Sequence, residues 1–134
     1  MSETLPWWQN GVIYQIYPKS FQDSTGTGTG DLNGIISRLD YLEKLGVSAL
    51  WLTPVYPSPQ IDNGYDVADY CAINPDYGTM ADFERLVEQA HQRGMRIVMD
   101  MVFNHTSTQH PWFVAAQDPA NEKHHFYIWR DGKA

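Results

Sequence analysis

The chain has a single cysteine, Cys71, so an intrachain disulfide is excluded. Basic residues are few: 9 Lys and Arg stand against 16 Asp and Glu, a formal net charge of −7. Without a basic run or face, a general affinity for nucleic acid or anionic membranes is disfavoured, although a few local donors can still hold a small phosphorylated substrate. No stretch approaches the roughly 20 apolar residues that span a bilayer, and no signal peptide is evident. We therefore expect a cytosolic protein that binds neither nucleic acid nor membrane.

Aromatic residues, by contrast, are plentiful, with 5 Trp, 8 Tyr and 5 Phe in 134 residues. Their flat faces and polar edges suit both core packing and carbohydrate binding, and composition does not separate the two uses. The hydrophobic fraction of 43% excludes a disordered chain.

Three apolar runs, at residues 12–17, 47–52 and 96–102, predict buried strands of a parallel sheet covered on both faces. Two amphipathic helices separate them. The first carries apolar residues from Ile35 to Leu45 and ends at Gly46; the second begins after a capping box of Thr79 and Asp82 and stops at Gly94. The order β-α-β-α-β predicts an α/β fold with right-handed crossovers.

Long loops follow the carboxyl ends of the predicted strands, whereas the helix-to-strand turns are short. This asymmetry places the chemistry at the carboxyl-terminal edge of the sheet. One of these loops, the alternation Asp23, Thr25, Thr27, Thr29 and Asp31, resembles the start of an oxygen-ligand calcium loop. Neutral threonines would hold Ca²⁺ or Mg²⁺ weakly, so a purely structural loop is the favoured interpretation, and the metal site is the alternative. The spacing of the histidines does not favour zinc.

Two further segments carry polar groups suited to a sugar site. In DNGYD at 62–66, the Asp62 carboxylate can accept bonds from hydroxyls and the Tyr65 ring can stack, although Asp-Asn-Gly alone is also a turn signature. In DMVFNH at 100–105, Asp100 sits in an apolar strand and requires a partner if buried, and Asn104 and His105 follow it. We expect Asp66, Asp69 and Asp76 to be solvated loop carboxylates, and Trp112, Phe113, Phe126, Tyr127 and Trp129 to pack or to form a rim.

These segments, together with WQNGVIYQIYP at 8–18 and GVSALWLTP at 46–54, resemble the N-terminal portion of family 13 glycoside hydrolases, the α-amylase clan of (β/α)₈ barrels. Within that family, YPKSF at 17–21 and NHTSTQHPWF at 104–113 are most similar to the α-glucosidases that hydrolyse trehalose 6-phosphate. Relatives that cut isomaltose-type bonds more often carry Arg at Lys19, Asp at Thr108, and Asn and Asp at Thr25 and Thr27.

The resemblance implies a role for each matching residue. Asp62 would bond the non-reducing glucose, Tyr65 would stack on it, and His105 would donate to a hydroxyl near the cleaved bond. Asp100 would orient neighbouring groups, with Asn104 beside it. The implied substrate is a disaccharide or its phosphate, and no cofactor is expected beyond the low-affinity metal. The implied chemistry is a retaining displacement between two carboxylates.

A (β/α)₈ barrel needs about 250 residues, so we interpret this chain as part of one. We expect residues 1–103 to form the first three strands and two helices of the barrel, and residues 104–134 to begin an inserted domain. The nucleophile and the acid/base are then expected beyond Ala134, and the chain alone should be inactive. Two alternatives stay open: an oligo-1,6-glucosidase or other α-glucosidase of the same family, and a non-catalytic carbohydrate-binding homologue.

Overall fold

The computed structural model describes residues 5–132 and contains one parallel sheet of three strands in the order β1-β2-β3. The strands are β1 (Ile13–Ile16), β2 (Ala49–Leu52) and β3 (Arg96–Met99). Ile13 pairs with Ala49, which pairs with Arg96, so the strands are in step and their carboxyl ends reach the same edge. All three predicted strands are confirmed, each somewhat shorter than its apolar run.

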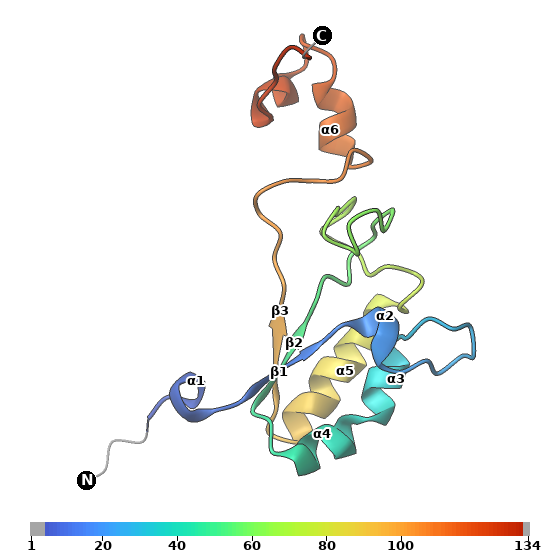
Figure 1. The fold of residues 1–134 in the computed structure, drawn as a ribbon, viewed down its shortest axis with the longest axis vertical. Coiled ribbons are helices and arrows are strands. Elements are labelled where there is room, and N and C mark those ends of the chain that lie inside the picture. The colour runs from blue at the N-terminus through green and yellow to red at the C-terminus, as the bar shows by residue number, and fades with distance from the viewer. Residues whose placement is uncertain (1–4, 133–134) are drawn as a thin grey trace.

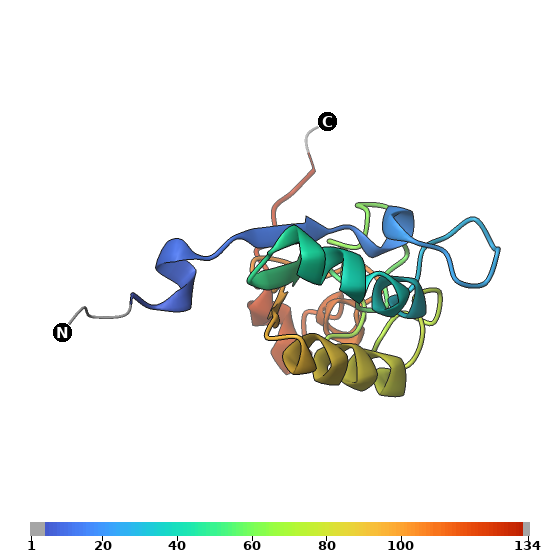
Figure 2. The same cartoon turned by 90° about the horizontal axis from the view of Figure 1, so that it is seen from below.

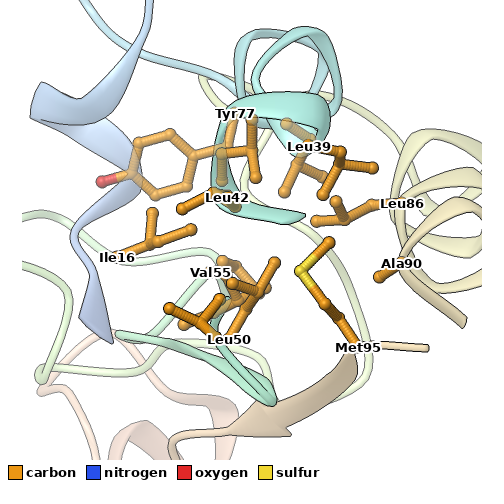
Figure 3. Close-up of a cluster of buried hydrophobic side chains, with 13 residues drawn as sticks. Ile16, Leu39, Leu42, Leu50, Val55, Tyr77, Leu86, Ala90 and Met95 are labelled. Atoms are coloured by element: carbon orange, nitrogen blue, oxygen red, sulfur yellow. The ribbon is translucent and has the colours of Figure 1, made fainter. Parts of the chain in front are cut away.

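Helices cover one face of this sheet (Figure 1). They are α3 (Leu32–Ser37), α4 (Leu39–Leu45) and α5 (Met80–Gln92). Between helices and strands lies a core of apolar side chains, including Leu39, Leu42, Leu50, Leu86 and Met95, with the ring of Tyr77 among them (Figure 3).

The helix ends form as their sequences predict. The side chain of Asp31 accepts a hydrogen bond from the Gly34 amide and so caps α3. Thr79 and Asp82 form a complete capping box at the start of α5. Gly46 ends α4 and Gly94 follows α5 with φ of 81° and 74°, in the left-handed region that glycine adopts without steric cost.

The first helix differs from the single helix that its periodicity predicts. It is broken at Arg38, which has φ −110° and ψ 5° and separates α3 from α4. The Ser37 hydroxyl donates to the Gly34 carbonyl over 2.7 Å. Such back-bonding by serine competes with the backbone ladder and bends helices.

The structure also contains four short helical segments whose sequences lack the periodic apolar pattern that predicts a helix. They are α1 (Trp7–Asn10), α2 (Pro18–Phe21), α6 (Pro111–Ala116) and the 3₁₀ helix η1 (Glu122–Phe126). Figure 2 shows the segment with α1 reaching out from the body of the chain. There the Trp7 ring lies 4.7 Å from the Arg96 guanidinium, which ties α1 to the start of β3.

The second face of the sheet is only partly covered by the described residues, contrary to the expectation of two covered faces. Ile13 is 49% exposed and Phe103, beyond the end of β3, is 84% exposed. The reason is that α3, α4 and α5 all lie on the same side of the strands. Within residues 5–132, no helix combines the length and the apolarity that crossing a membrane requires.

Candidate active site at the carboxyl edge of the sheet

The structure brings the two predicted sugar-binding segments together, although Tyr65 and Asp100 are 35 positions apart in the sequence. The Tyr65 hydroxyl donates to Asp100 Oδ2 over 2.9 Å. The indole nitrogen of Trp51, on β2, donates to the same oxygen over 3.2 Å. The half-buried Asp100 carboxylate therefore has the partners that its place at the end of an apolar strand requires.

His105 makes a second link between these segments. Its Nε2 lies 3.1 Å from the Tyr65 carbonyl oxygen. Because a carbonyl only accepts, Nε2 carries the proton, and the amide of Asn104 then faces Nδ1 at 3.4 Å. The Nε2 proton, which we expect His105 to donate to a sugar hydroxyl, is donated here to the Tyr65 carbonyl. A sugar hydroxyl that accepts this proton must share it with that carbonyl or displace the carbonyl.

Two tyrosines from the loop after β2 hold the backbone that leaves β3. Tyr56 donates to the Asp100 carbonyl over 3.1 Å. The Tyr70 hydroxyl lies 2.5 Å from the Val102 carbonyl and 2.8 Å from that of His105. Sequence reasoning missed both, because their partners lie more than 30 residues away; their position in a long loop beyond a strand end is the only signal that the sequence offers.

These contacts shift the pKa values of the phenols. Burial, followed by the hydrogen bond to Asp100, raises the pKa of Tyr65. Burial, followed by the Asp100 charge, raises the pKa of Tyr56. Both phenols therefore keep their protons at neutral pH and act as donors.

Asp62 itself is exposed, and its backbone carbonyl accepts from the Tyr65 amide over 2.9 Å. The turn that carries it includes two non-glycine residues with positive φ, Gln60 at 60° and Asn63 at 53°. Asp62 and Tyr65 thus sit at either end of one tight turn above the strand edge, with an open carboxylate and a half-buried ring.

Asp66 differs from its expected solvated state. Its carboxylate accepts hydrogen bonds from the Ser58 hydroxyl and from the amides of Ile61 and Asp62. Burial acts to raise its pKa, but these hydrogen bonds outweigh burial and the pKa is lowered. Asp69 and Asp76 are exposed, as expected.

Beside His105 lies an open groove of about 1110 Å³. Tyr70 and Asn104 line one part, and Trp112, Phe126 and Tyr127 line another. Phe113 and Trp129 instead stack on each other, with ring centroids 5.7 Å apart. The rings that line the groove also pack: Tyr127 lies edge-on to Phe113 at 5.2 Å, and Trp112 lies edge-on to Phe126 at 5.5 Å. The aromatic residues therefore pack against one another, and three of them also line the groove.

The threonine-rich loop gathers around Asp23. The Asp23 carboxylate accepts from the amides of Thr25, Gly26 and Gly28 at 2.7 to 2.8 Å. The amide of Gly28, above all, lowers the pKa of Asp23. The hydroxyls of Thr25 and Thr27 lie 3.3 Å apart.

Asp31, the other carboxylate of this loop, accepts from Ser24 and from the Gly34 amide. The donor set is all oxygen, which fits Ca²⁺ or Mg²⁺, but both carboxylates already hold the loop. Among residues 5–132, no three His, Cys, Asp or Glu side chains are grouped to hold a metal ion. The metal site at Asp23, Thr25, Thr27, Thr29 and Asp31 stays a prediction.

Comparison with known proteins decides the family. Residues 15–134 match the family described as "Alpha amylase, catalytic domain". The chain belongs to this family. Its (β/α)₈ fold class is thereby confirmed, with the described sheet as the first part of such a barrel.

Individual relatives are close in sequence. The chain is 69% identical over 127 residues to the trehalose-6-phosphate hydrolase of Escherichia coli K12, covering 95% of this chain. It is 57% identical over 94% of its length to a protein named probable oligo-1,6-glucosidase 2 of Bacillus subtilis 168.

Solved structures agree in shape. Bacillus licheniformis trehalose-6-phosphate hydrolase matches with a TM-score of 0.91 at 58% identity over 96% of this chain. An isomaltulose synthase mutant of Erwinia rhapontici NX5 in complex with D-glucose matches with a TM-score of 0.93 at 53% identity over 97%. The chain spans 23% of the length of each of these four relatives.

Proposed function

We propose that this chain is the N-terminal part of a retaining α-glucosidase that hydrolyses α,α-trehalose 6-phosphate to glucose and glucose 6-phosphate in the cytosol. The observation that carries the proposal is the 69% identity to the trehalose-6-phosphate hydrolase of Escherichia coli over 95% of the chain. This activity is proposed for the full-length protein, the longer chain of which these residues form a part.

The proposed site uses the residues at the carboxyl edge of the sheet. Asp62, exposed on its turn, accepts hydrogen bonds from the non-reducing glucose, and Tyr65 stacks on the same ring. His105 donates to a hydroxyl near the scissile bond and shares that proton with the Tyr65 carbonyl. Asp100 fixes the Tyr65 hydroxyl, and Asn104 lies against His105.

The bonds that the Tyr65, His105 and Tyr70 side chains make between the two segments serve orientation. A reacting group displaced by 1 Å can lose about a hundredfold in rate, so a sugar site gains from a rigid frame. Here the frame consists of Tyr65, His105 and Tyr70, whose bonds join the turn after β2 to the chain leaving β3.

The bond-breaking groups are proposed to lie beyond Ala134. In a retaining glycosidase one carboxylate attacks the anomeric carbon, and a second, about 5–5.5 Å away, protonates the leaving oxygen and then activates water. We assign neither role to a residue of this chain. Residues 1–103 supply part of the barrel wall in this proposal, and residues 104–134 begin the inserted domain.

A second candidate activity has its own support. The 57% identity to a probable oligo-1,6-glucosidase is close enough to keep α-1,6-glucosides as an alternative substrate. A substrate panel on the full-length protein separates the two. We expect kcat/KM to be higher on trehalose 6-phosphate than on isomaltose; the reverse order would replace the proposed substrate, and hydrolysis of neither would favour a carbohydrate-binding homologue.

A further inference from the structure

Asp66 stands one residue beyond Tyr65, yet its carboxylate is directed back into the turn that carries Asp62. Oδ1 accepts from the Ser58 hydroxyl at 2.7 Å and from the Asp62 amide at 3.2 Å. Oδ2 accepts from the Ile61 amide at 3.0 Å. One half-buried side chain therefore fixes three points of the turn, one of which is the backbone of Asp62 itself.

The turn needs such an anchor because its backbone is strained. Gln60 and Asn63 both have positive φ, at 60° and 53°, the left-handed region that side chains other than glycine seldom adopt unless the surrounding structure holds them there. The Ser58 hydroxyl that donates to Asp66 also accepts from the Gln60 amide at 2.9 Å. Asp66 and Ser58 thus fix the position of Gln60, the strained residue two positions before Asp62.

We propose that Asp66 is a positioning residue of the sugar site: its carboxylate fixes the main chain at Asp62 and so sets the direction from which the Asp62 carboxylate meets the glucose. This inference rests on the proposed function, because it takes Asp62 as the group that binds the sugar. Asp66 itself does not touch the substrate in this arrangement.

The charge of Asp66 is part of this role. All three recorded partners of the carboxylate are donors, an O–H and two N–H groups. Asn in its place would have one oxygen for them and would turn an amide NH₂ toward at least one. Asp66→Asn therefore removes the anchor while it keeps the size of the side chain.

The test measures Asp66→Asn in the full-length protein with trehalose 6-phosphate as substrate. We expect kcat/KM to fall by about tenfold or more, as a misplaced binding group predicts. Asp76→Asn is the matched control, because Asp76 in the same loop after β2 is exposed and lies outside the groove beside His105. It should stay within about twofold of the unmodified protein. Ser58→Ala, which removes one donor, should give a smaller loss in the same direction and serves if Asp66→Asn does not fold.

A double-mutant cycle separates positioning from general stability. In an Asp62→Asn background, Asp66→Asn should cost no more than about a further twofold, because the group that it positions is already altered. We measure both kcat/KM and the Kd of glucose for each variant, so that the cycle can be completed even where turnover is too slow to measure. An equal loss in both backgrounds, or no loss in either, would overturn the inference while the proposed function stands. Absence of hydrolysis by the unmodified full-length protein would overturn both.

Discussion

The Tyr65 hydroxyl and Asp100 Oδ2 are 2.9 Å apart, and this one bond joins the turn after β2 to the end of β3. The Trp51 indole approaches the same oxygen from the central strand. A carboxylate at a strand end is thereby held by donors from two neighbouring segments. In the proposed enzyme this places the stacking ring and the hydroxyl-binding histidine on one rigid frame.

Tyr65→Phe tests this frame because it removes the bond and keeps the ring. In the full-length protein we expect the free energy of unfolding to fall by about 1 kcal/mol, the typical worth of such a bond. We expect kcat/KM on trehalose 6-phosphate to fall by about tenfold, which corresponds to about 1.4 kcal/mol of transition-state stabilisation.

Urea denaturation and steady-state kinetics measure the two effects. Tyr41→Phe is the control, since Tyr41 is 53% exposed on α4. If Tyr65→Phe leaves both the free energy of unfolding and kcat/KM unchanged, the bond from Tyr65 to Asp100 neither stabilises the protein nor orients the site.

Alkaline pH should weaken the core at Tyr77. Burial raises the pKa of Tyr77 from 10.0 to about 12. The folded state thus favours the neutral phenol, so its contribution to stability is complete below pH 10 and is lost as the pH rises toward about 12. Within this window the slope is at most about 1.4 kcal/mol per pH unit for this group.

Urea denaturation of the full-length protein and of its Tyr77→Phe variant, between about pH 9 and about pH 11.5, tests this expectation. We expect the unmodified protein to lose stability more steeply above pH 10 than the variant does. Tyr41→Phe controls for the loss of one titrating phenol. Parallel curves for the unmodified protein and Tyr77→Phe would contradict the buried, neutral Tyr77.

The threonine-rich loop predicts a weak response to divalent cations. With two carboxylates that already accept backbone bonds, we expect Ca²⁺ or Mg²⁺ to raise the thermal midpoint only at roughly millimolar concentration. Asp23→Asn should abolish that rise and also lower the midpoint without metal, because the carboxylate receives three loop amides. Differential scanning calorimetry with EDTA as reference measures both. A rise at micromolar Ca²⁺ would show a built metal site instead of a self-sufficient loop.

Local patterns in the sequence were enough for the strands, the capped helix ends and the edge at which the site lies. Each depends on neighbours in the chain: an apolar run, Thr79 three residues before Asp82, or a glycine after a helix. The break at Arg38 was missed because the apolar period continues across it, whereas a serine hydroxyl interrupts the backbone ladder.

The contacts within the candidate site were predicted only in part, because most of them join residues that are far apart in the sequence. Asp62, Tyr65, Asp100 and His105 follow strand ends and could be proposed from spacing. Tyr70 could not, because its hydroxyl bonds backbone oxygens 32 and 35 residues away. The local sequence also does not predict that the Asp66 side chain points inward, because DNGYD is equally compatible with a carboxylate that faces solvent.

We expect the 134 residues on their own to be unstable and prone to aggregation. Ile13 is 49% exposed on the sheet face that lacks the helices, and β1 and β3 are edge strands of the described sheet. Exposed strand edges and apolar faces pair with other chains. We expect aggregation or partial unfolding in size-exclusion chromatography and no hydrolysis; a monomer with a cooperative thermal transition would contradict this.

The most direct test of the proposed function follows the hydrolysis of trehalose 6-phosphate by the full-length protein with time-resolved proton NMR. A retaining displacement at the unphosphorylated glucose predicts glucose and glucose 6-phosphate in equal amounts, with the glucose first appearing as its α-anomer. Glucose that first appears as the β-anomer would contradict the retaining mechanism. Intact trehalose 6-phosphate would contradict the proposed substrate.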